Sequence, residues 1–116
     1  MKSEDRLYVD KLLNLYLGLP ETPSRTSRHD RQLAYRLYEQ QVSLEIVEAA
    51  FLLGSVRRIL RDPSYPASGP IRSLHYFLPV IQEVMATHLP KSYVQYLRSK
   101  LATHTTRKPV PVTPPD

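Results

Sequence analysis

The arginines of this chain are numerous and grouped, so they are the residues that could bind an anionic ligand. The sequence holds sixteen lysines and arginines against eleven acidic residues, which gives a net charge of +5. Two groups of arginines stand out along the chain: Arg25, Arg28 and Arg31 near one expected helix start, and Arg57, Arg58, Arg61 and Arg72 on either side of one expected loop. Guanidinium groups bind phosphate oxygens well, and a positive balance attracts phosphate polymers or acidic protein surfaces. The pattern therefore predicts a phosphate-binding arginine surface.

Residue types that serve catalysis or metal binding form no comparable pattern. No two of the four histidines have the i, i+4 spacing that places a pair of imidazoles on one helical face. Cysteine is absent, so disulfides, thiolate ligands and thiol nucleophiles are excluded. Asp62 and His75 could approach each other across a loop, yet no serine or threonine is singled out as a nucleophile. We expect a protein that is not an enzyme and that uses neither a metal ion nor a cofactor.

Residues 44–60, LEIVEAAFLLGSVRRIL, predict the helix that organises the fold. The segment is apolar on nearly every side, and such a helix needs other helices around it. Ser43 is the expected N-cap, and Gly54 is expected to allow a close crossing with another helix. The sequence thus predicts a central buried helix near residues 44–61.

Four further helical segments are expected around it. We predict helices near residues 4–18 and 28–41, a helical segment after Pro70 and a last helix after Pro90. Pro79 predicts either a kink in the segment after Pro70 or two short helices that meet near Phe77. The inward faces are expected to hold Leu7, Tyr8, Leu12, Leu15, Tyr16 and Leu19, then Leu33, Ala34, Leu37 and Tyr38, and finally Tyr93, Val94, Leu97 and Leu101.

The expected fold class is therefore all-α, a compact bundle of about five helices in a single domain over residues 1–104. Residues 62–70, rich in proline, are expected to form a loop, and residues 105–116 a flexible, extended proline-rich tail. That tail contains a K-x-x-P-x-x-P pattern from Lys108 to Pro114, which polyproline-binding domains could recognise. No apolar run approaches the ~20 residues of a membrane span, so a cytoplasmic protein without a membrane partner is expected.

Two alternative uses of these elements involve nucleic acid. The second and central helices, joined at residues 41–43, look like a helix-turn-helix, but the exposed start of the central helix offers Glu45 and Glu48, which repel phosphate. We therefore interpret that helix as core rather than as a recognition helix. Eight tyrosines could stack on bases, although most occupy core positions and Tyr65 in the loop is the freest.

A resemblance points in the same direction. The succession LEIVEAAFLLGSVRR, a proline-rich loop and PIRSLHYFLPVIQEV resembles helical modules of bacterial replication-initiation proteins, including the DnaD-like replication domain, and of mobile-element proteins. It covers about residues 30–86 and rests on helix order and an aromatic-aliphatic helix; Pro79 and the absence of a following tryptophan depart from the DnaD pattern. The resemblance implies DNA association through Arg57, Arg58, Arg61 and Arg72.

Two functions fit these expectations. The first is a small non-enzymatic DNA-associated accessory protein of replication, transposition or another bacterial mobile element, with DNA favoured as nucleic acid and a larger protein of the same system as a second partner. The alternative is a helical adaptor without nucleic-acid binding, which would expose an apolar groove with Tyr76 and Phe77 at its rim. The strand form of the nucleic acid and the oligomeric state, including a homo-oligomer, are left open.

Overall fold

The computed structural model describes residues 3–60 and 71–105, with side chains as far as residue 103. Within these ranges the chain forms helices and no strand: α1 (Glu4–Leu17), α2 (Arg28–Glu39), α3 (Leu44–Ile59), the short 3-10 helix η1 (Leu74–Phe77), α4 (Leu78–Thr87) and α5 (Lys91–Thr105). The expected all-α bundle of about five helices is confirmed. The predicted loop, the tail beyond α5, Arg61 and Tyr65 lie outside the described residues.

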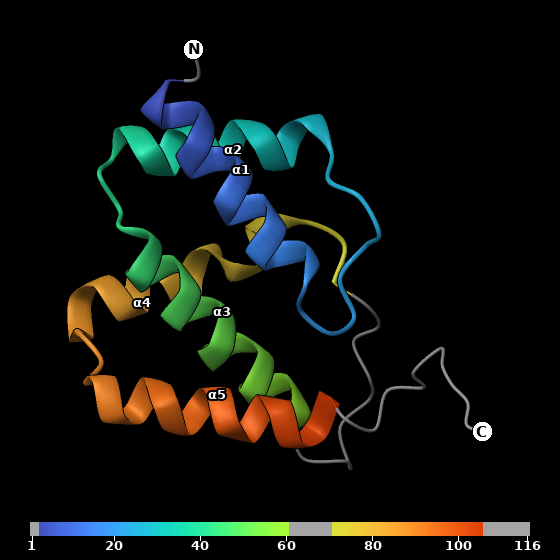
Figure 1. Ribbon diagram of the computed structural model, residues 1–116, viewed down its shortest axis with the longest axis vertical. Helices are drawn as coiled ribbons and strands as arrows, with labels where there is room; N and C mark the ends of the chain where they lie inside the picture. Colours follow the sequence, from blue (N-terminus) through green and yellow to red (C-terminus); the bar gives the residue numbers. More distant parts are fainter. Residues whose placement is uncertain (1–2, 61–70, 106–116) are drawn as a thin grey trace.

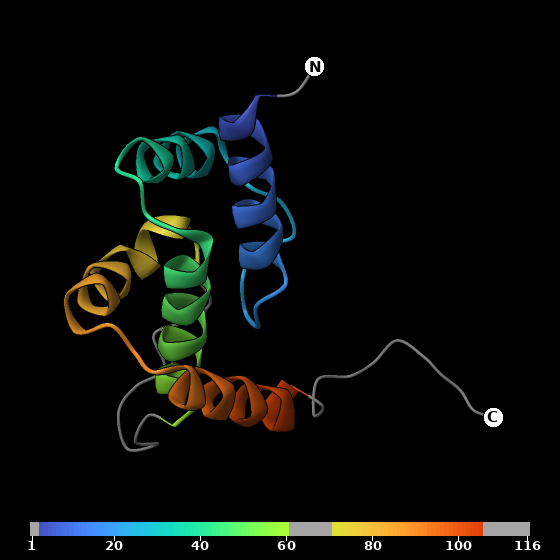
Figure 2. The same cartoon turned by 60° about the vertical axis from the view of Figure 1, so that its left-hand side comes forward.

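Helix α3 is the centre of the bundle. It contacts α1, α4, α5 and η1, and Figures 1 and 2 show α1 and α2 at one end and α5 crossing the other. Val47 and every residue from 49 to 56 are buried. This part of α3 has no face left to enter a DNA groove, and the exposed side chain at the start of the helix is the carboxylate of Glu45. The interpretation of this segment as core is confirmed.

Local capping sets where the central elements begin and end. The Ser43 hydroxyl accepts a hydrogen bond from the Ile46 amide and starts α3, as expected. Helix α2 ends with a Schellman motif, in which the amides of Gln41 and Val42 donate back to carbonyls of the last turn. Gln41 has φ 62° there, a left-handed conformation in which glycine is usual. Glu21, between α1 and α2, and His88, after α4, also have positive φ.

The Gly54 position brings α3 into direct contact with an aromatic ring. A Cβ atom at Gly54 would lie 2.8 and 2.9 Å from two ring carbons of Phe77. The Phe77 ring is buried against Phe51 and Tyr16, with centroids at 5.0 and 6.3 Å. The expected close crossing at Gly54 is confirmed, and its partner is the end of η1.

Pro79 separates two helical segments rather than kinking one. Helix η1 ends at Phe77 and α4 begins at Leu78, so Pro79 lies in the first turn of α4. A proline is tolerated there because the first amides of a helix have no partner within it. Of the two alternatives that the sequence left open, the meeting of two short helices near Phe77 is the one observed.

Two expected inward residues face solvent instead. Leu7 is 45% exposed, and on α1 the buried residues are Val9, Leu12, Leu13 and Tyr16, a stripe that excludes position 7. Tyr93 is 39% exposed and stacks on Tyr96 at the surface. Helix α5 packs mainly on α3, so it buries only a narrow stripe. The predictions for Leu7 and Tyr93 were wrong, because periodicity does not tell how many neighbours a helix has.

We predict opposite effects for alanine at two glycines. In Gly54→Ala the new methyl group clashes with the buried Phe77 ring, so the free energy of unfolding should fall by about 1–2 kcal/mol. The control is Gly18→Ala, in which the nearest atoms are 3.6 Å from the added carbon. Because alanine lowers the entropy of the unfolded chain, the free energy of unfolding should rise by about 0.4–1 kcal/mol. Urea denaturation measures both. A gain at both positions would show that the Phe77 ring can move aside.

One partly buried tyrosine, Tyr8, and one fully buried tyrosine, Tyr16, predict that the protein loses stability at alkaline pH. Burial raises the pKa of Tyr8 to about 12, and burial together with the negative charge of Asp30 raises the pKa of Tyr16 to about 12. An unfolded tyrosine titrates near its ordinary value of 10.0. Because the folded pKa is the higher one, each contribution is complete below pH 10 and is lost as the pH rises toward 12.

Tyr16→Phe should therefore flatten the loss of stability between pH 10 and 12. At about pH 7 it should be neutral or stabilising by up to ~1 kcal/mol, because the buried Tyr16 hydroxyl has no hydrogen-bond partner among the described residues. Tyr8→Phe is the matched variant: its hydroxyl donates to the Val42 carbonyl at 2.6 Å, so its loss should cost about 0.5–1.5 kcal/mol at the same pH. Denaturation across this pH range tests both, and an equal cost at neutral pH would contradict the prediction.

Candidate nucleic-acid interface

The predicted arginines do not all have the same role in the fold. Arg57, in the last turn of α3, donates two hydrogen bonds to the Glu83 carboxylate of α4, at 2.8 and 2.7 Å. The hydrogen bond to Glu83 is the main cause that raises the pKa of Arg57, and the same bond lowers the pKa of Glu83. This bidentate pair links the two helices. Arg57 is therefore engaged within the protein.

Arg58 is engaged more deeply still. Its side chain is only 9% exposed and pairs with the Glu21 carboxylate of the α1–α2 linker. Its Nη1 atom donates to the Tyr76 hydroxyl at 3.4 Å, and its Cζ atom lies 5.2 Å from the centre of the Tyr76 ring. Burial lowers the pKa of Arg58, but the hydrogen bonds to Tyr76 and Glu21 outweigh it and the pKa is raised. Arg58 thus connects α3, the linker and η1.

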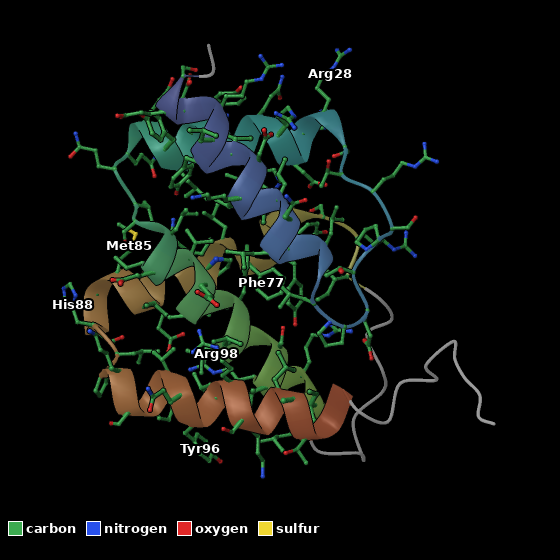
Figure 3. The ribbon with its side chains drawn as sticks, in the orientation of Figure 1. Arg28, Phe77, Met85, His88, Tyr96 and Arg98 are labelled. Carbon is green, nitrogen blue, oxygen red and sulfur yellow. The ribbon has the colours of Figure 1, made fainter. Side chains whose placement is uncertain are left out.

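The remaining described arginines of the prediction are at the surface. Arg31 donates to Asp10 at 3.2 Å in an exposed ion pair, and such pairs contribute only about 0–1 kcal/mol. Arg25, Arg28 and Arg72 are exposed, and among the described residues they form no ion pair. Figure 3 shows Arg28 extending away from the start of α2. These three side chains are available to an external ligand.

Two hydrogen bonds join the segment that contains Arg72 to the part of the chain that carries Arg25 and Arg28. The Ile71 amide donates to the Glu21 carbonyl, and the Leu74 amide donates to Oδ1 of Asp30, both at 2.9 Å. The segment around Arg72 is thereby held along the stretch from residue 21 to residue 30, which carries Arg25 and Arg28. In Figure 1 the segment that follows residue 71 (yellow) passes close to the α1–α2 linker, to which the Ile71 amide is hydrogen-bonded. We call Arg25, Arg28 and Arg72 the arginine edge.

Asp30 is the residue that sequence reasoning missed. It is buried, and its second oxygen accepts from the Ser27 amide while the Ser27 hydroxyl accepts from the Asp30 amide. This is a capping box with aspartate at the third helical position. The spacing Ser27-x-x-Asp30 could have indicated the box. No local pattern could have indicated the contact with Leu74, which is 44 positions away.

The expected groove beside Tyr76 and Phe77 is not formed as predicted. Tyr76 is 40% exposed, but Phe77 is fully buried because Gly54 leaves room for its ring, so Phe77 cannot border a groove. A groove of about 480 Å³ lies elsewhere, between α3, α4 and α5. Its lining includes the apolar side chains of Ile46, Ala49, Val84, Leu89 and Val94, together with the ion pair between Glu48 and Arg98 at 2.9 Å.

The described residues form neither a metal site nor a membrane-spanning helix. No group of three or more histidine, aspartate or glutamate side chains there is arranged to hold a metal ion. In the same part of the chain, no helix has the length and apolar character that crossing a membrane requires.

The chain was compared with protein families, curated proteins and solved structures. No protein family, curated protein or solved structure matches the chain. The resemblance to DnaD-like modules stays a prediction.

We predict that Asp30 contributes twice to stability. In Asp30→Ala the Ser27 amide and the buried Leu74 amide both lose their carboxylate acceptor, so the free energy of unfolding should fall by about 2–4 kcal/mol. Ser27→Ala removes the cap alone and should cost about 0.5–2 kcal/mol. Chemical denaturation of the two variants compares them. Equal losses would mean that the bond to Leu74 does not hold the Arg72 segment in place.

Proposed function

We propose that this protein is a small non-enzymatic nucleic-acid-binding accessory protein that contacts phosphates through the arginine edge. DNA is the expected polymer, and the expected setting is replication, transposition or a related process of a bacterial mobile element. One observation carries the proposal: Arg25, Arg28 and Arg72 are exposed, lack an acidic partner among the described residues, and lie on segments that Asp30 and Glu21 hold together. Exposed arginines without carboxylate partners suit the phosphate backbone.

The proposed surface leaves out Arg57 and Arg58, which the sequence had also predicted as phosphate contacts. A phosphate at Arg57 would compete with two hydrogen bonds to Glu83, and one at Arg58 would have to displace Glu21 from a side chain that is largely buried. Arg31 needs to give up only an exposed pair with Asp10, so it can join the edge when a phosphate is near.

The burial of α3 favours binding that does not depend on base sequence. The helix that would enter the major groove in a helix-turn-helix is buried from residue 49 to residue 56, and its exposed start carries Glu45, which repels phosphate. Backbone contacts fix position and supply affinity, but they do not identify bases. We therefore expect similar affinity for oligonucleotides of different sequence, together with a strong dependence on salt.

The triple variant Arg25→Gln, Arg28→Gln, Arg72→Gln tests the edge. Its affinity for a labelled oligonucleotide should fall, and the slope of log affinity against log salt should flatten by about 0.7–0.9 for each phosphate that the variant no longer neutralises. Fluorescence anisotropy at several salt concentrations measures both. The control is Lys11→Gln, Arg36→Gln, Lys91→Gln, which removes the same charge from exposed positions on α1, α2 and α5.

The two triple variants separate a local site from general charge. Equal reductions in affinity would show that net charge, not the arginine edge, drives binding. As a further arm, Glu21→Gln removes a carboxylate next to the edge and should tighten binding. Absence of nucleic-acid binding by the parent protein at low salt would overturn the proposal.

That last outcome would favour the alternative function, a helical protein-interaction adaptor. The observation behind the alternative is the groove between α3, α4 and α5, with its apolar lining. Binding in an apolar groove would depend little on salt, whereas binding at the arginine edge depends on it strongly.

A further inference from the structure

The exposed tyrosine Tyr76 is linked to the segment that carries Arg72. Arg58 contacts both Glu21 and Tyr76, and the Glu21 carbonyl holds the Ile71 amide immediately before Arg72. Tyr76 is therefore linked to the segment of Arg72 through a chain of three contacts, Tyr76 to Arg58, Arg58 to Glu21 and Glu21 to Ile71. Tyr76 belongs to η1 and is 40% exposed, although the neighbouring Phe77 is buried.

The Tyr76 ring is held in position by groups that the fold has already fixed. The Arg58 guanidinium lies over the ring and hydrogen-bonds to its hydroxyl. The buried Phe77 ring meets it nearly at a right angle, with centroids 5.0 Å apart. Figure 3 shows Phe77 in the interior of the bundle. A ring restrained in this way loses little conformational freedom when a ligand packs on it.

The chemistry that suits a restrained ring beside phosphate-binding arginines is an unpaired base. Bases stack on exposed aromatic rings in single strands, whereas in a duplex their faces are already covered by neighbouring bases. The Glu21 carboxylate is also near, but it is paired with Arg58 and does not repel an uncharged base. We propose that Tyr76 is a base-stacking residue and that the ligand of the arginine edge is single-stranded nucleic acid. This inference rests on the proposed function.

The test compares two probes and three tyrosine variants. The probes are a fluorescent oligothymidine of about 20 nucleotides, long enough to span a typical single-strand site, and a fluorescent duplex of the same length. Tyr76→Leu keeps apolar bulk but cannot stack, and Tyr76→Phe keeps the ring without its hydroxyl. Tyr96→Leu is the control, since Tyr96 is an exposed tyrosine of α5. Thermal unfolding of each variant shows whether the fold is kept.

The parent protein should bind the single strand more tightly than the duplex. Tyr76→Leu should weaken single-strand binding by about 5-fold to 100-fold, the range that removal of one stacked base produces. Its affinity for the duplex and its salt slope should change little, because every arginine of the edge is retained. Tyr76→Phe and Tyr96→Leu should bind like the parent.

The failure of this inference is distinct from the failure of the proposed function. If the triple arginine variant binds more weakly with a flatter salt slope while Tyr76→Leu binds the single strand like the parent, the edge stands and the stacking role is overturned. A parent preference for duplex, or an equal reduction in Tyr76→Phe, also overturns it. A parent that binds neither probe overturns both proposals.

Discussion

The arrangement of this protein's surface depends on one buried carboxylate. Asp30 closes the capping box of α2 with one oxygen and accepts the Leu74 amide with the other, so a single side chain orients a helix start and anchors a segment that follows 44 positions later. A buried carboxylate is costly unless its oxygens are hydrogen-bonded, and here both are. The position of Arg72 relative to Arg25 and Arg28 follows from this arrangement.

The arginines show how one residue type takes two roles according to its neighbours. Arg57 and Arg58 each meet a carboxylate from another element and act as cross-links between helices. Arg25, Arg28 and Arg72 meet none among the described residues and keep their donors for solvent or a ligand. The difference lies in tertiary contact, since all of these side chains have the same charge and donors.

Features with a local cause were predictable from the sequence, whereas pairings across the fold were not. Ser43 starts α3, Gly54 marks a crossing and Pro79 separates two helices because capping, the absence of a Cβ atom and proline geometry act within a few residues. The burial of Phe77 and the exposure of Tyr93 depend on which helices are adjacent. The arginine edge depends on contacts between distant segments, so no sequence pattern indicated that the segment of Arg72 is hydrogen-bonded to residues 21 and 30.

The turns between helices carry a consequence for how the domain holds together. Glu21, Gln41 and His88 lie in three separate connections, and each has a left-handed backbone without being glycine. Such conformations cost roughly 1–3 kcal/mol apiece, and the surrounding structure has to impose them. Their sum is comparable to the net stability of a small domain, about 5–15 kcal/mol. The intrinsic backbone preferences of these three residues thus disfavour the conformations that the turns require. Neighbouring helices are held at their angles by the shared core, so that the domain should fold and unfold as one cooperative unit rather than helix pair by helix pair.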